Sequence, residues 1–154
     1  MFDLQVQVNN DSRDDYYTPK RLFDALGLQF DVDVCAPRGG VAWLPALKHY
    51  SIIDDGLQQE WLGKVWCNPP YSKPGPWIER MIVHNNGIAL VCTSKAAWFQ
   101  NAWNNAGGVL LLPNDLKFTR PDGAVKGIFM QTVLFAFGSD NVEAMRQSNL
   151  GFVR

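Results

Sequence analysis

Charge is scarce in this chain, and long apolar runs are absent from it. Charged side chains make up 19% of the 154 residues, and the formal net charge is -1. A protein that holds nucleic acid mainly by counterion release needs a more basic surface. A membrane-spanning helix needs roughly 20 apolar residues in a row. The start at Met1 also lacks the basic and apolar segments of an export signal. We therefore expect a cytoplasmic protein with no membrane contact.

Cysteine and histidine are also few, which limits metal and nucleophilic chemistry. The chain has three cysteines and two histidines: Cys35, Cys67, Cys92, His49 and His84. Their spacings match neither C-x-x-C nor H-x-x-x-H, so we predict no metal site and no catalytic triad. In a cytosolic protein the thiols are expected to be reduced.

Hydrophobic residues, in contrast, are plentiful and make up 47% of the chain. This share and this length are typical of one packed domain. Residues 1–15 are polar and acidic without periodicity, so we expect a flexible acidic arm there. Residues 16–154 are expected to form a single catalytic domain.

Predicted strands and helices alternate along that domain. Thr18-Pro19 predicts a helix start, and Gly27 its end. Later helices are expected over residues 76–85 and 97–104, and strands over residues 30–34, 65–67, 88–93, 108–112 and 131–137. Residues 38–53 are expected to be mostly loop. The alternation predicts an α/β fold, a Rossmann-like sandwich with a mostly parallel sheet, whose ligands bind at the carboxyl ends of the strands.

Asn68-Pro69-Pro70-Tyr71 carries the most specific chemistry and follows a predicted strand. Two prolines stiffen the loop and leave its carbonyls available as acceptors. The Asn68 amide oxygen and the Pro69 carbonyl can accept the two N–H groups of an amine on a planar ring, while Tyr71 stacks on that ring. The nitrogen lone pair then turns toward an electrophile. These four residues are the predicted catalytic residues; the alternative is a rigid turn after a strand.

Six segments together carry a resemblance to a known family. They are Tyr17-Thr18-Pro19 with Leu22-Phe23, Phe30-Asp31-Val32-Asp33-Val34-Cys35-Ala36, Asp54-Asp55-Gly56-Leu57 with Trp61, Trp66-Cys67-Asn68-Pro69-Pro70-Tyr71-Ser72 with Trp77, Leu112-Pro113 with Phe118, and Leu134-Phe135-Ala136-Phe137-Gly138. From about residue 16 to residue 138, the chain resembles the phage-type DNA N6-adenine methyltransferases of the Dam group. Asn-Pro-Pro-Tyr also occurs in enzymes that methylate RNA adenine or protein glutamine, but the flanking segments point to DNA.

The resemblance implies S-adenosylmethionine as cofactor. It places Tyr17, Thr18 and Pro19 against the methionine part, Asp33 near the ammonium, and the small Cys35 and Ala36 beside the cofactor. Asp54 or Asp55 would accept from its adenine amino group or ribose hydroxyls. A helix cap or a solvated turn is the alternative for each aspartate taken alone. The loop after Asp33 lacks a Gly-x-Gly signature.

The resemblance also implies site-specific methylation of N6 of adenine in DNA, by a phage or prophage gene product in the bacterial cytoplasm. The target adenine would have to be flipped out of the duplex. Candidate DNA-binding residues are Ser72, Lys73, Lys95, Lys117 and Arg120, and solvated side chains are the alternative. Two other functions stay open, methylation of RNA adenine or protein glutamine and a catalytically silent nucleic-acid-binding module.

Overall fold

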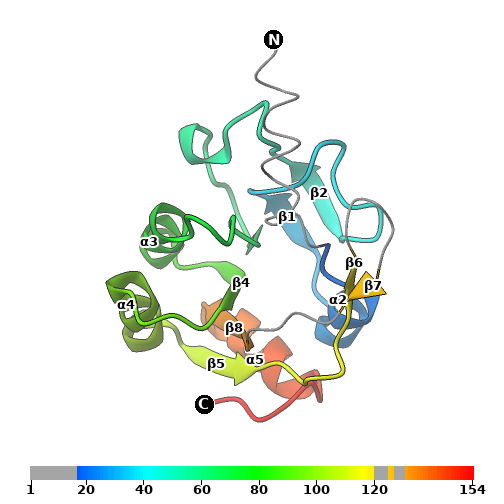
Figure 1. Cartoon of the computed structure of the whole chain (residues 1–154), viewed down its shortest axis with the longest axis vertical. Helices are drawn as coiled ribbons and strands as arrows, with labels where there is room; N and C mark the ends of the chain where they lie inside the picture. The colour runs from blue at the N-terminus through cyan, green and yellow to red at the C-terminus, as the bar shows by residue number, and fades with distance from the viewer. Residues whose placement is uncertain (1–16, 120–124, 127–130) are drawn as a thin grey trace.

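The computed structural model describes residues 17–119, 125–126 and 131–154 of the chain (Figure 1). The predicted acidic arm over residues 1–15 lies outside them. The helices are α2 (Lys20–Leu26), the short 3-10 helix η2 (Gly56–Gln58), α3 (Gly75–His84), α4 (Ala97–Asn105) and α5 (Ser139–Gln147). The strands are β1 (Phe30–Asp33), β2 (Ala46–His49), β3 (Val65–Cys67), β4 (Gly87–Cys92), β5 (Gly108–Leu111), β6 (Phe118–Thr119), β7 (Val125–Lys126) and β8 (Thr132–Phe137).

The main sheet has six strands in the order β2-β1-β3-β4-β8-β5, so the predicted α/β class is confirmed. The strands β2, β1, β3 and β4 are parallel, and β8 is antiparallel to both of its neighbours. Four of the six strands are thus parallel, as expected of a mostly parallel sheet, while β8 makes the sheet mixed rather than purely parallel. A parallel neighbour would require a crossover connection, whereas β8 pairs with β5 without one.

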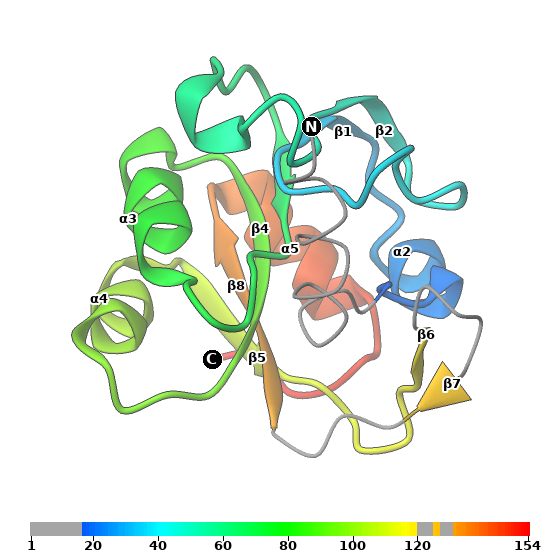
Figure 2. The same cartoon turned by 45° about the horizontal axis from the view of Figure 1, so that its top comes forward.

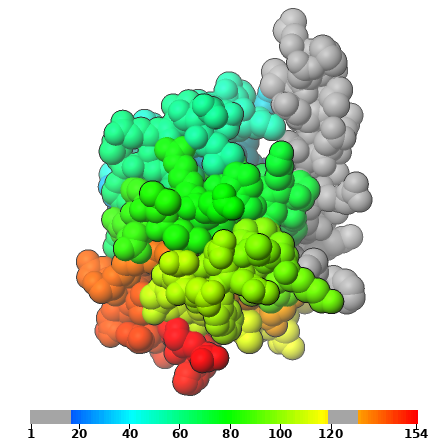
Figure 3. All heavy atoms as spheres, turned by 90° about the vertical axis from the view of Figure 1, so that its left-hand side faces the viewer, coloured from blue at the N-terminus to red at the C-terminus, as the bar shows by residue number. Residues whose placement is uncertain are grey.

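Helices cover both faces of the sheet. Leu22 of α2 and Met145 of α5 join one buried cluster, and Ile78 of α3 and Ala102 of α4 join the other. The helices α2 and α5 accordingly lie on one side and α3 and α4 on the other (Figure 2). In the space-filling view, the green and yellow-green part of the chain that includes α3 and α4 occupies the middle of one face of the molecule (Figure 3). The core is therefore split into two layers by the sheet.

Most predicted elements are present, and two differences stand out. Strand β2 lies inside residues 38–53, which were expected to be mostly loop. It is an edge strand with three exposed residues out of four, so it lacks the apolar alternation that marks a strand. Helix α5 was not predicted, although it buries Val142 and Met145 against the sheet.

The residues after α5 return to the sheet. Val153 forms an antiparallel bridge with Leu110, and Val109 and Arg154 exchange two backbone hydrogen bonds of 2.9 Å. The outer edge of β5 is therefore paired. Across the described parts of the chain, no helix combines the length and the apolar character needed to cross a membrane.

Candidate functional site

The carboxyl ends of β1, β3 and β4 form one edge of the sheet, with β3 between the other two. Asp33 is opposite Trp66 in the register, and the Val34 N–H donates to the Trp66 carbonyl at 3.0 Å. Asn68 follows β3 directly. The structure thus brings together the two segments that sequence analysis placed at strand ends.

Asp33 is a carboxylic acid buried at this edge, with 3% of its surface exposed. Burial raises its pKa from 3.8 to about 7, and a hydrogen bond from the Cys35 N–H at 3.3 Å opposes the rise. No ion pair of the described residues includes Asp33. A buried carboxyl without a cation beside it is stabilised when a cationic ligand binds there.

The cysteines at the same edge are free thiols. Burial raises the pKa of Cys67 well above its usual value, and the charges of Cys35 and Asp33 raise it further. Cys67 is therefore a neutral packing residue directly before the loop of residues 68–71. Cys35, half-buried, lies close enough to Asp33 for its N–H to bind the carboxylate.

The segment of Tyr17, Thr18 and Pro19 lies beside the loop of residues 68–71. The Asn68 side-chain Nδ2 donates to the Thr18 hydroxyl at 3.5 Å, across 50 positions of sequence. The Trp43 indole N–H donates to the Thr18 carbonyl at 2.7 Å, and the rings of Tyr17 and Trp43 meet edge to face at 6.4 Å. Trp43 thus anchors this segment against the site.

Asp54 and Asp55 lie in the loop after β2, and both are exposed. Asp54 accepts from the Ser51 N–H at 2.9 Å. Asp55 has a φ of 55° and accepts from the Leu57 N–H at 3.3 Å, which caps η2. Asp54 thus stabilises a local turn and Asp55 caps a helix. These are the structural roles that sequence analysis gave as the alternative to ligand binding.

The loop nevertheless reaches the site through Gly56. A Cβ atom at Gly56 would lie 1.9 Å from the Val34 carbonyl oxygen, so only glycine permits this approach of the two backbones. Val34 follows Asp33. The Asp54-Asp55 pair is therefore held near the carboxyl end of β1.

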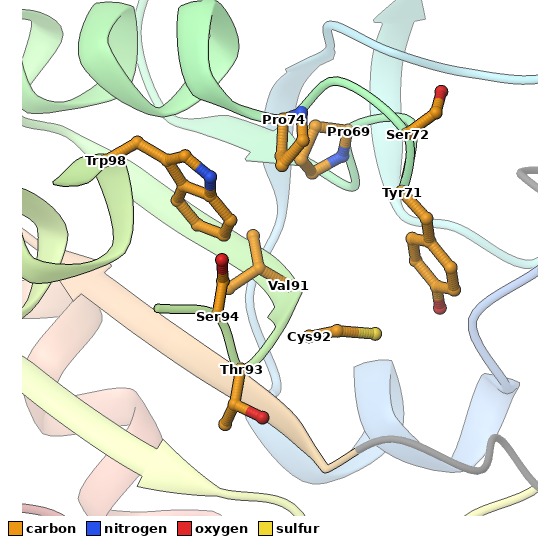
Figure 4. A pocket seen from close by; sticks show the side chains of 9 residues that line it. All are labelled: Pro69, Tyr71, Ser72, Pro74, Val91, Cys92, Thr93, Ser94 and Trp98. Atoms are coloured by element: carbon orange, nitrogen blue, oxygen red, sulfur yellow. The ribbon is translucent and has the colours of Figure 1, made fainter. Parts of the chain in front are cut away.

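A pocket opens on the opposite side of the loop, toward β4, with a volume of about 240 Å³. Its apolar and aromatic walls are Pro69, Tyr71, Pro74, Val91 and Trp98, and its polar lining is Ser72, Cys92, Thr93 and Ser94 (Figure 4). Trp98, Val91 and Cys92 were not among the predicted site residues. For Val91 and Cys92, the one signal in the sequence is their position near the end of a predicted strand, whereas Trp98 lies in the predicted helix over residues 97–104.

Tyr71 forms one wall of this pocket and also contacts Cys92. A hydrogen bond from Tyr71 lowers the pKa of the Cys92 thiol, but burial outweighs it and the net shift is upward. The Tyr71 hydroxyl lies toward the sulfur atom in Figure 4. The orientation of the Tyr71 ring is thus coupled to the end of β4.

The predicted DNA-binding residues have different positions. Ser72 lines the pocket, and Lys73, Lys95 and Lys117 are exposed. Lys73 follows the pocket-lining Ser72, and Lys95 follows Ser94. Arg120 lies outside the described residues.

Comparison with known proteins gives matches over most of the chain. Residues 5–135 match the family model described as DNA N-6-adenine-methyltransferase (Dam). The DNA N-6-adenine-methyltransferase of Escherichia phage T1 is 36% identical over 77 residues, which cover 45% of this chain and 32% of that protein. The enzyme of the same description from Haemophilus phage HP1 (strain HP1c1) is 27% identical over 95 residues, which cover 56% of this chain and 53% of that protein. The matched part thus spans about a third to a half of these relatives.

Proposed function

Because the chain belongs to the DNA N-6-adenine-methyltransferase (Dam) family, we propose that it transfers a methyl group from S-adenosylmethionine to N6 of adenine in DNA. Residues 16–154 would form the catalytic domain, a Rossmann-like methyltransferase sandwich. Both relatives are encoded by phages, which supports an action in the cytoplasm of a bacterial host.

The cofactor would bind on the β1 side of the loop of residues 68–71. The residues on this side fit the positive charge of the cofactor, because the buried Asp33 carboxyl can bind its ammonium group. The buried Thr18 and the half-buried Cys35 line the same edge. When bound, S-adenosylmethionine supplies an electrophilic methyl group, whose bond to sulfur breaks as the bond to N6 forms.

The target adenine would bind on the β4 side, in the pocket of about 240 Å³. The Tyr71 ring and the Trp98 indole offer flat aromatic surfaces on which a base can stack. A stacked and paired adenine cannot reach this position, so the base is proposed to leave the duplex. Lys73 and Lys95, which follow pocket-lining residues, are proposed to contact phosphates.

The loop of residues 68–71 lies between these two sides, and this is the observation that carries the proposal. The Asn68 amide oxygen and the Pro69 carbonyl would accept the two N–H groups of N6. That arrangement turns the N6 lone pair toward the methyl group on the β1 side. Methyl transfer would leave a neutral thioether and a positively charged N6, which would then release one of its two protons to solvent.

Transfer of tritiated methyl from S-adenosylmethionine tests the proposal directly. Label in DNA, recovered as N6-methyladenine after digestion, is the expected result. Label in RNA instead would identify RNA adenine as the substrate, and label in protein would identify glutamine. Binding of DNA without transfer to any of the three would identify a catalytically silent module.

A further inference from the structure

Arg80 of α3 makes an unusual set of contacts for a charged side chain. Its guanidinium donates to the backbone carbonyls of Gly56, Leu57 and Gln59, with 2.5 Å to the Leu57 oxygen. No carboxylate forms an ion pair with Arg80 in the part of the chain that the structure describes. All of its hydrogen bonds described here therefore hold the backbone at η2, where short helices leave carbonyls without partners.

Trp61 fixes the same backbone from a second direction. The guanidinium lies 4.8 Å from the centre of the Trp61 ring, which is buried and stacks on Trp77 at 6.4 Å. The Trp61 indole N–H donates to the Gly56 carbonyl at 2.9 Å. Arg80 and Trp61 thus share Gly56 as a common acceptor, and the planar guanidinium is held by stacking as well as by hydrogen bonds.

These contacts end at the predicted cofactor side of the site. Gly56 lies against the Val34 carbonyl, directly after Asp33, and Asp54-Asp55 precede it. Helix α3, which carries Arg80, begins shortly after the loop of residues 68–71. One side chain therefore ties the loop after β2 to the helix that follows the predicted catalytic loop.

We propose that Arg80 is a positioning residue that holds the Asp54-Asp55 loop in the conformation that binds S-adenosylmethionine. This inference rests on the proposed function. Arg80 acts through Gly56 and Leu57 and does not touch the reacting atoms. Its loss weakens cofactor binding and leaves the methyl-transfer step at saturating cofactor nearly unchanged.

The test is Arg80→Met, which keeps most of the side-chain stem and removes the charge and the donors. Titration calorimetry with S-adenosylmethionine should show a loss of affinity of roughly tenfold to a hundredfold, the range for charge-assisted hydrogen bonds. Single-turnover methylation at saturating cofactor should stay within about threefold of wild type. Hydrogen exchange of the amides of residues 56–61 should become faster, and cofactor should slow it again. Arg80→Lys keeps the charge without the planar fork and should recover part of the affinity.

Met81→Ala is the matched control. Met81 is fully buried on the same helix, so its truncation destabilises the domain while the guanidinium donors of Arg80 remain. This variant should retain wild-type affinity for S-adenosylmethionine. Equal losses in Met81→Ala and Arg80→Met would overturn the proposal, as would wild-type affinity in folded Arg80→Met. If the wild-type protein itself binds no S-adenosylmethionine, the proposed function fails. That result differs from the two results that would overturn the role of Arg80.

Discussion

Replacement of Asp33 by asparagine should stabilise the free protein while it abolishes cofactor binding. The two side chains have nearly the same shape, and both accept from the Cys35 N–H, but only aspartate ionises. Burial raises the pKa of Asp33 from 3.8 to about 7, so ionisation is disfavoured in the folded state. The difference of roughly three pKa units corresponds to about 4 kcal/mol.

The sign of this effect defines a pH window. Below pH 3.8 Asp33 is protonated in both the folded and the unfolded protein, so it does not lower the free energy of unfolding. Between pH 3.8 and about 7 the unfolded chain releases this proton first, so the free energy of unfolding falls as the pH rises. Above about pH 7 the loss is complete. At pH 8 the Asp33→Asn variant should therefore be more stable than wild type by up to about 4 kcal/mol, and each kcal/mol raises Tm by roughly 2–4 °C.

Cofactor binding should show the opposite preference. An ammonium group favours ionised Asp33, so wild-type affinity for S-adenosylmethionine should rise by up to about tenfold per pH unit from pH 5 to 7, a range in which α-amino groups stay protonated. The variant should bind weakly at every pH.

Urea unfolding and calorimetry from pH 4 to 8 measure both effects, with Asp31→Asn as the control. Asp31 is an exposed aspartate on the same strand. If Asp33→Asn bound cofactor with wild-type affinity and wild-type pH dependence, the assignment of Asp33 to the cofactor would be refuted.

Three further predictions concern catalysis and DNA binding. Asn68→Ala should lower methyl transfer by about 10²–10³ because one preorganised acceptor is lost, with little change in cofactor affinity by calorimetry; near-parent rates would contradict its role. Tyr71→Phe should keep most activity because a ring suffices for stacking, whereas Tyr71→Ala should weaken binding of DNA with an unpaired target adenine, measured by fluorescence anisotropy. DNA affinity should fall with salt with a logarithmic slope of roughly 3 to 4, about 0.9 for each of the four candidate cations; a slope near 10 or near zero would argue against this footprint.

Sequence reasoning could reach the parts of the site that depend on local patterns. Asp33 ends β1 and Asn68 directly follows β3, and the carboxyl ends of parallel strands meet at one edge, so their proximity could be predicted. Their chemical roles remain predictions. The antiparallel direction of β8 could not be predicted, because its apolar run reads the same in either direction.

The features that sequence reasoning missed depend on tertiary contacts. Trp98 lies on an amphipathic helix, where an indole is normally a core residue, and only the packing of α4 beside the loop after β3 places it at the pocket. Arg80 likewise appears in the sequence as a solvated helix cation. Its acceptors are backbone carbonyls more than 20 residues away, and carbonyls leave no mark in the amino-acid pattern.

The two outer strands of the sheet differ in how they are protected from other chains. The free edge of β5 is capped by Val153 and Arg154, while β2 is short and carries Lys48, both of which discourage strand addition. Removal of residues 152–154 would uncover a row of backbone donors and acceptors next to the exposed Leu111. Residues 152–154 thus protect the edge of β5 from pairing with another chain. Their removal should produce concentration-dependent oligomers and leave methyl transfer unchanged.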